Sequence, residues 1–245
     1  APRPLRLLPL PHEAGAAKLA LDAEAMLVRG DSAWIALEQR NAVQRYRLPG
    51  WRREAEARPP AMRGWRGNSG PEAMVRLADG RFLVIAEGRP DAPFSPALLF
   101  DGDPAEAGTA AARLRYRRPS GFRPTDAALL PDGRLLILNR RFGWLSGIGA
   151  ILVVADSDGL REGATIEGRE LATLAPPLTV DNMEALSVAR EGGRTIVRIA
   201  SDDNFMALQR TLLLEFALDE PGRRARERPD GPVGRGGGLG ARLRD

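Results

Sequence analysis

The sequence contains no cysteine and a single histidine, His12. Without cysteine the chain forms no disulfide, no thiolate nucleophile and no cysteine-ligated metal site. A Ser-His-Asp triad or a histidine-ligated zinc site would depend on His12 alone, which argues against both kinds of hydrolase. Because a chain without cysteine tolerates either redox state, this absence leaves the cellular compartment open.

Lysine is almost absent too, since Lys18 is the only one among 36 basic residues and the rest are arginine. The formal net charge is +4. Two explanations stay open, a coding preference for arginine and the recognition of anions or phosphates by planar guanidinium groups. The basic residues are scattered among acids, without a basic helix or an aromatic RNA-binding motif, so we expect no nucleic-acid partner.

Long apolar runs are missing as well. None approaches the roughly 20 residues that a membrane-spanning helix needs, so we expect no membrane span. A hydrophobic content of 43% and a charged content of 28% are typical of a globular protein. Residues 221–245 are rich in Gly, Arg and Pro, so we predict a single domain over residues 1–220 followed by a poorly ordered tail over residues 221–245.

A repeated unit organises the rest of the chain. It consists of an alternating strand, a turn, a second strand that ends in a polar residue, and a third strand. Asp-Gly turns between alternating runs, such as Asp79-Gly80 and Asp132-Gly133, are strong hairpin signals. Sheet repeats of about 40–50 residues indicate a β-propeller. The unit recurs over residues 21–48, 70–100, 124–155 and 181–218.

Four repeats do not close a ring comfortably at this chain length. We therefore predict an all-β fold: a β-propeller of five to six four-stranded blades, or one whose first blade is incomplete. Residues 1–20 and 156–180 are expected to supply strands for a further blade.

One acid stands near the start of each unit, and propeller blades place equivalent positions around one axis. Acids that converge at one mouth repel one another unless a cation neutralises them. Calcium suits such a set, because it binds about 6–8 carboxylate, amide and backbone oxygens in flexible geometry. The acids are Glu24, Glu72, Asp126 and Glu184, separated by 48, 54 and 58 residues.

The fourth unit carries two clusters of oxygen ligands, residues 181–184 and 201–204. Their spacing is not that of an EF-hand, so the metal hypothesis depends on convergence alone. The alternative is that these acids cap strand ends and bind backbone N–H groups in turns. Asp202, Asp203 and Asn204 exceed what one turn needs, which points to function at that cluster.

The most distinctive strings are DAEAM, NSGPEAM, RPTDAALLPDGRLLILNRRF, DNMEALSV and SDDNFMALQRTLLLEF. They resemble the family called esterase-like activity of phytase, and the resemblance covers most of residues 20–218. It implies a β-propeller in an exported, commonly periplasmic bacterial protein, and hydrolysis of a phosphate ester or carboxylic ester. The Gly-Leu-Ser-Gly type opening of the family's first blade is not visible here.

We therefore expect a periplasmic or secreted, phytase-like or esterase-like propeller hydrolase that acts on a small-molecule phosphoester or other ester, assisted by calcium. Without a second histidine or a cysteine, such an enzyme would use metal-activated water with an Asp or Glu as base. Two alternatives stay open, a non-catalytic propeller that binds a small ligand or a protein partner, and a lactonase-like calcium-dependent hydrolase.

The candidate residues follow from these hypotheses. Guanidinium groups that flank the acidic positions would hold a phosphate. The predicted catalytic residues are Asp202, Asp203 and Glu184, the predicted substrate-binding residues are Arg140, Arg141 and Arg210, and the predicted calcium ligands are Glu24, Glu72, Asp181, Asn182 and Asn204.

Overall fold

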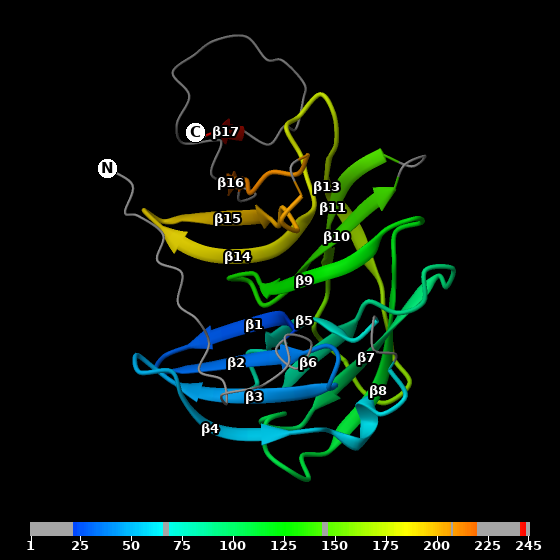
Figure 1. Cartoon of the computed structure of the whole chain (residues 1–245), viewed down its shortest axis with the longest axis vertical. Helices are drawn as coiled ribbons and strands as arrows, with labels where there is room; N and C mark the ends of the chain where they lie inside the picture. Colours follow the sequence, from blue (N-terminus) through cyan, green and yellow to red (C-terminus); the bar gives the residue numbers. More distant parts are fainter. Residues whose placement is uncertain (1–21, 66–68, 144–146, 207, 220–240, 244–245) are drawn as a thin grey trace.

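The computed structural model describes residues 22–65, 69–143, 147–206, 208–219 and 241–243. Apart from a short 3-10 turn, η2 (Pro60–Met62), the regular elements of these residues are β-strands. The strands form four sheets that are arranged as the blades of a propeller (Figure 1). The predicted all-β propeller arrangement is therefore confirmed.

Each blade begins with an inner strand and continues outward. Blade 1 holds β1 (Ala23–Arg29), β2 (Ser32–Leu37), β3 (Ala42–Arg47) and β4 (Arg52–Ala57). Blade 2 holds β5 (Pro71–Arg76), β6 (Phe82–Ala86), β7 (Phe94–Phe100), β8 (Ala111–Arg117) and β12 (Thr165–Ile166). Blade 3 holds β9 (Arg123–Leu129), β10 (Leu135–Gly143), β11 (Gly147–Ala155) and β13 (Gly168–Leu174). Blade 4 holds β14 (Met183–Glu191), β15 (Arg194–Ser201), β16 (Leu213–Leu218) and β17 (Ala241–Leu243).

The local sequence explains why these segments become hairpins. In β15 the buried residues alternate with less buried ones, as expected for a strand that packs one face on a core. The turn that precedes it places Gly192 and Gly193 at φ angles of 54° and 73°. Two consecutive left-handed residues form the tight turn that matches the twist of a β-hairpin, and glycine adopts this conformation without a steric cost.

The predicted number of five to six blades is wrong, because the described residues form four. Residues 156–180 do not start a further blade. Instead β12 pairs in parallel with β8 of blade 2, and β13 pairs with β11 as the outer strand of blade 3. Blade 1 has all four of its strands, and residues 1–20 lie outside the described residues. Of the predicted tail, the described part is β17, which pairs with β16.

Successive blades are held together by separate apolar cores. Because complete burial of a large apolar side chain stabilises a protein by about 1.5–3 kcal/mol, each core fastens one blade to the next. The core between blades 1 and 2 contains Trp34 and Phe82. The core between blades 2 and 3 contains Tyr116 and Ile137, and the core between blades 3 and 4 contains Leu152 and Val197.

The inner strands pack on one another in the order β1, β5, β9 and β14. In Figure 1 the arrowheads of β1, β9 and β14 point the same way, so the first residues of these strands lie at the same end. All four strands line a central cavity of about 940 Å³. On the side of blades 1 and 4, Met26 and Leu213 line this cavity and remain exposed.

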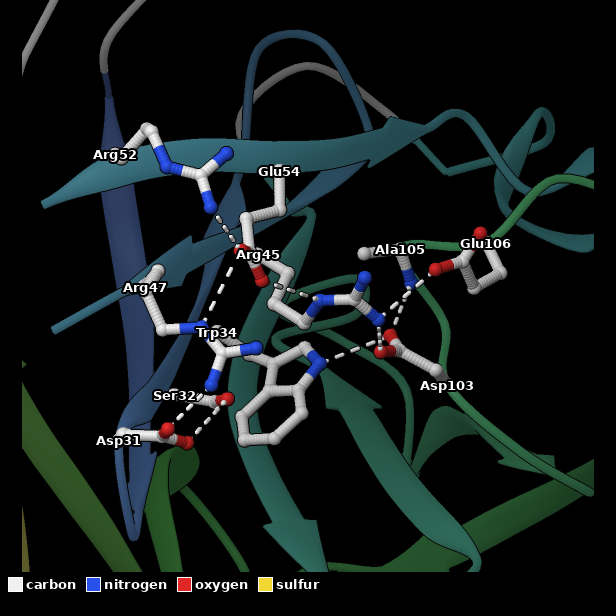
Figure 2. A network of polar contacts seen from close by, with 10 residues as sticks. All are labelled: Asp31, Ser32, Trp34, Arg45, Arg47, Arg52, Glu54, Asp103, Ala105 and Glu106. Atoms are coloured by element: carbon white, nitrogen blue, oxygen red, sulfur yellow. Dashed lines mark hydrogen bonds and ion pairs between the residues drawn. The ribbon is translucent and has the colours of Figure 1, made fainter.

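Blades 1 and 2 also share a polar network (Figure 2). Trp34 Nε1 donates to Asp103 Oδ1 at 2.8 Å, and Arg45 binds both Asp103 and Glu106. On the other side of Arg45, Glu54 lies 3.7 Å away. Since Asp103 belongs to the loop after β7, these contacts tie blade 2 to the face of blade 1.

None of the helices in the described part of the chain has the length and hydropathy of a membrane span.

Candidate functional site

A β-bulge near the start of three inner strands positions an acid. Ala23 pairs with Leu37 and Ala25 with Ala36, so Glu24 is the extra residue. The same shift occurs at Glu72, between Pro71 and Ala73, and at Glu184, between Met183 and Ala185. Because a bulge re-aims the side chain at the extra position, three glutamates occupy equivalent places at one end of the inner strands.

The inner strand of blade 3 departs from this pattern. In β9, Pro124 pairs with Asn139 and Asp126 with Leu138, so the bulge residue is Thr125. Thr125 Oγ1 donates to the backbone oxygen of Met183 at 3.0 Å. Asp126 lies one position further and accepts hydrogen bonds from the N–H groups of Leu186 and Ala127 at 2.7 and 2.8 Å. Asp126 therefore fastens β9 to β14 and is not the counterpart of the three glutamates.

A second row of residues lies where the neighbouring strands reach the same end. The N–H groups of Glu38, Glu87 and Asp202 donate to the carbonyl oxygens of Asp22, Gly70 and Asn182 at 2.9, 3.0 and 3.0 Å. These identical contacts make Glu38, Glu87 and Asp202 equivalent positions, and Arg140, which pairs with Arg123, is the equivalent position in blade 3. We call the carboxyl groups of both rows and the adjacent Asp22 the acid ring: Asp22, Glu24, Glu38, Glu72, Glu87, Glu184 and Asp202.

Burial and mutual repulsion raise the pKa of several members of the acid ring. Glu72, whose exposed fraction is 5%, loses hydration and also faces Glu24 and Glu87, which raises its pKa to about 10. Burial and the charges of Asp22 and Glu38 raise the pKa of Glu24 to about 7. Desolvation likewise raises the pKa of Glu38. Without a counter-ion, the ring cannot ionise fully at neutral pH.

Two arginines of blade 3 compensate only part of this charge. Arg140 donates to Asn182 and lies 3.1 Å from Glu184 Oε1 and 3.8 Å from Glu87 Oε1. Arg123 donates to Glu87 Oε1 at 2.7 Å. Desolvation raises the pKa of Glu184 to about 7 although Arg140 acts in the opposite direction. In the acid ring and its immediate surroundings, carboxyl groups thus outnumber guanidinium groups.

The chemistry of the donors fits a hard divalent cation. In the described part of the chain, Asp22, Glu24 and Glu38 each offer a carboxylate oxygen, and these oxygens lie within 4.8 Å of one another. Oxygens that bind one calcium ion at about 2.4 Å lie within roughly 5 Å of each other. The buried carboxyl of Glu72, which interacts with Glu38 and Glu24, adds a further oxygen donor.

The structure brings some predicted site residues together at the acid ring. The amide of Asn182 joins the two rows, because its Nδ2 donates to Glu184 Oε1 at 2.7 Å while its Oδ1 accepts from Arg140. The predicted residues found there are Glu24, Glu72, Asn182, Glu184, Asp202 and Arg140.

Other predicted residues lie outside the ring. Asp181 is buried and accepts hydrogen bonds from the N–H groups of Asn182 and Arg210 at 2.9 and 3.0 Å. The side chain of Arg210 is 61% exposed and its Nε lies 3.9 Å from Asp181 Oδ2. The guanidinium of Arg141 lies 4.7 Å from the centre of the Phe122 ring, which is a cation–π contact. These contacts give Asp181 and Arg141 structural roles.

Asp203 and Asn204 belong to the β15–β16 loop (residues 202–212, of which 207 lies outside the described residues). Asp203 accepts from the N–H of Phe205 at 2.9 Å and from Thr211 Oγ1 at 3.0 Å. Asn204 Nδ2 donates to Gln209 Oε1 at 3.0 Å. Asp203 and Asn204 therefore stabilise the loop. The cluster of Asp202, Asp203 and Asn204 is divided between two places, since Asp202 lies at the acid ring and the other two lie in the loop.

Residues that the sequence did not nominate also belong to the site: Asp22, Glu38, Glu87 and Arg123. The signal for Glu38 and Glu87 lies in the repeat, since both follow the second strand of their unit. Asp22 and Arg123 carry no such signal, because their places in the site depend on contacts with residues distant in sequence, Glu38 and Glu87.

Comparison with curated protein sequences found no match. Solved structures that match include a protein of unknown function from Bacteroides caccae, with 11% sequence identity and a TM-score of 0.42 over 82% of this chain. The chain spans 57% of the length of that protein. The family described as "Phytase-like: Esterase-like activity of phytase" matches residues 2–205. The chain therefore belongs to the family of the esterase-like activity of phytase.

Proposed function

We propose that the acid ring binds calcium and supports hydrolysis of a phosphoester or another ester. The observation that carries this proposal is the placement of Glu24, Glu72 and Glu184 at equivalent bulges around one mouth. Ordinary structural acids pair with cations or cap turns, whereas Glu72 is buried and repelled by Glu24 and Glu184, and Arg140 compensates Glu184 only in part. Membership of the family supports ester hydrolysis as the reaction class.

Asp22, Glu24 and Glu38, assisted by Glu72, would hold the cation. Bound calcium would neutralise these carboxylates and polarise the oxygen of an ester. The residues that hold it must release protons first, since burial favours their neutral forms. A calcium requirement is compatible with a periplasmic or secreted location, which the resemblance implies.

Glu184 is our candidate for proton transfer. Its pKa of about 7 lets the carboxylate accept a proton from water and the carboxylic acid return it to a leaving group near neutral pH. Arg140, 3.1 Å from Glu184, orients this carboxylate and supplies positive charge next to it. Asn182, which also accepts a hydrogen bond from Arg140, donates to the same oxygen.

The test is hydrolysis of p-nitrophenyl phosphate and p-nitrophenyl acetate with calcium and after chelation. We expect turnover of at least one substrate that depends on calcium and is lost in Glu24→Gln. Glu167→Gln is the matched control, because Glu167 is an exposed partner of Arg117 on the outside of blade 2. Calcium binding without turnover of either ester would favour the non-catalytic alternative, and the absence of both binding and turnover would contradict the proposal.

A further inference from the structure

The large apolar side chains that stay exposed in the described part of the chain fall into two groups. Met26, Val28 and Leu213 line the central cavity. The others lie toward the end of the acid ring, in the last residues of β10, in the segment before β14 and in the β15–β16 loop. These are Phe142, Leu178, Phe205, Met206 and Leu208.

The strongest concentration is in the β15–β16 loop. Phe205 is 96% exposed, Leu208 is 90% exposed and Met206 is 55% exposed. Side chains of this kind normally pack on a core, and a contiguous apolar surface marks a binding site more often than a single exposed residue does. In Figure 1 this loop, drawn in orange, follows the arrowhead of β15 at the end where the inner strands begin.

The loop is built to hold these side chains outward. Asn204 and Phe205 have φ angles of 48° and 55°, a left-handed conformation that is strained for a phenylalanine. The N–H of Asn204 donates to Asp202 Oδ1 at 3.0 Å, and that of Phe205 donates to Asp203 Oδ1 at 2.9 Å. At the base of the loop, Ser201 Oγ donates to Arg210 O at 2.6 Å. The exposure of Phe205 is thus imposed by the fold at an energetic cost, which points to function.

Asp202 connects this loop to the acid ring. Its N–H binds Asn182 O, and its charge acts on Glu184. Phe205 follows three residues later, so its Cα lies within roughly 11 Å of the Cα of Asp202. Because this distance is an upper limit between Cα atoms and both side chains extend into it, an apolar group attached to an ester at the ring is within reach of Phe205.

We propose that Phe205, Met206 and Leu208 form the specificity surface of the site and bind the apolar acyl or aryl group of an ester substrate. This inference rests on the proposed function and narrows its substrate class. The charges of the ring agree with it. Arg140 and Arg123 are already engaged by Glu184 and Glu87, so the ring offers little positive charge of its own to a polyanionic substrate.

A membrane surface fits this loop less well as an occupant. The apolar residues follow two acids, Asp202 and Asp203, and the basic residue of this loop, Arg210, lies 3.9 Å from Asp181, whereas loops that insert into anionic membranes carry several flanking basic residues. Binding of a substrate group needs no such flank. We therefore assign the loop to the substrate.

The experiment compares two monoanionic analogues of a tetrahedral ester intermediate, methyl methylphosphonate and methyl hexylphosphonate, by calorimetry in the presence of calcium. A fully buried methylene contributes roughly fourfold in affinity. Since this surface covers only one side of the alkyl chain, we expect each methylene to raise the affinity about twofold. The hexyl compound should then bind about thirtyfold more tightly than the methyl compound. In Phe205→Asn and Leu208→Ser we expect this ratio to fall below about fivefold while methyl methylphosphonate binds as before. Asn is used at position 205 because it tolerates the left-handed conformation.

The outcomes separate this inference from the proposed function. Binding of both analogues with equal affinity, or a ratio unchanged in both variants, overturns the specificity surface and leaves the ring as an ester site. Failure of both analogues to bind overturns the inference and contradicts the proposed function as well. Val28→Ser is the control, because Val28 lines the central cavity. If Val28→Ser lowers the affinity ratio and the loop variants do not, the apolar group binds in the cavity and the inference is overturned.

Discussion

Two clusters of charged residues in this protein differ in charge balance: one pairs acids with arginines, and the other has an excess of acids. Between blades 1 and 2, Arg45 lies between Asp103, Glu106 and Glu54 (Figure 2). Arg47 and Arg52 also form ion pairs with Glu54. In the acid ring, carboxyl groups face one another and Arg140 compensates only in part. Charges that are paired stabilise the fold without a ligand. Carboxylates that are left in excess and away from water raise the pKa of neighbouring carboxyl groups, and a bound cation can neutralise them.

The largest effect should follow from removing the proton-transfer group of the ring. Because general acid–base catalysis contributes about a hundredfold or more, Glu184→Gln should lower kcat/KM for ester hydrolysis by at least that factor. The melting temperature at pH 8 should not fall, since the change removes a partly buried charge that desolvation disfavours. Activity within threefold of the unmodified protein would remove Glu184 from the mechanism.

Breaking the balanced network should have the opposite profile. Asp103→Ala leaves the Arg45 guanidinium and the Trp34 N–H without their shared partner, so we expect a loss of about 2–3 kcal/mol in the free energy of unfolding. Urea denaturation measures this loss, and calcium affinity should stay unchanged. The control is Asp31→Ala, which removes an exposed, solvent-screened pair with Arg47 and should lower the free energy of unfolding clearly less than Asp103→Ala does. Equal losses in the two variants would contradict the special role of Asp103.

The pH dependence of stability should report the excess charge of the ring. Glu24 and Glu184 have folded pKa values of about 7, above their ordinary value of 4.5, so the native state binds more protons than the unfolded state between these values. Stability without calcium should therefore fall as the pH rises from about 4.5 to 7, and Glu72 should extend the fall towards pH 10.

Calorimetric melting at pH 5, 7 and 9, with chelator and with calcium, checks this dependence. A loss of 1 kcal/mol corresponds to roughly 2–4 °C in a protein of this size, so we expect a decrease of several degrees. Calcium should stabilise the protein more at pH 9 than at pH 5, because binding requires ionised carboxylates. Parallel pH curves with and without calcium would show that the ring does not bind the ion.

The smallest predicted effect concerns the β15–β16 loop. A left-handed backbone costs a residue with a side chain about 1–2 kcal/mol, and Phe205 buries almost none of its surface in return. Phe205→Gly should therefore raise the free energy of unfolding by about 1 kcal/mol. Phe142→Gly in strand β10 is the matched control and should lower it, because glycine weakens a strand. Destabilisation by Phe205→Gly would mean that this side chain supports the fold.

The repeat predicted the strands well, because alternation and Asp-Gly turns are local properties. It predicted too many blades because a strand pattern does not say which sheet a strand joins. Residues 156–180 look like the start of another unit, yet β12 and β13 complete blades 2 and 3. Only partners distant in sequence decide this, since an edge strand pairs wherever an unpaired backbone is available.

The site was predicted in part for a related reason. Glu24, Glu72 and Glu184 stand at the same step of the repeat, and the structure gathers them in one ring. Asp126 stands at the same apparent step, yet the register of β9 gives that position to Thr125. A shift of one residue redirects a side chain to the other face of a strand, and spacing along the chain does not reveal a bulge.

The sequence by itself therefore determined the strands, the hairpin turns and the excess of acids near the strand ends, because these depend on neighbouring residues, and its match over residues 2–205 determined the family. Only the tertiary structure decided which acids meet. It joined Glu38 and Asp22 to the ring, gave Asp126 and Asp181 to backbone N–H groups, and turned Phe205 outward. The physical reason is that burial and repulsion act between side chains that the fold brings together, whatever their separation along the chain.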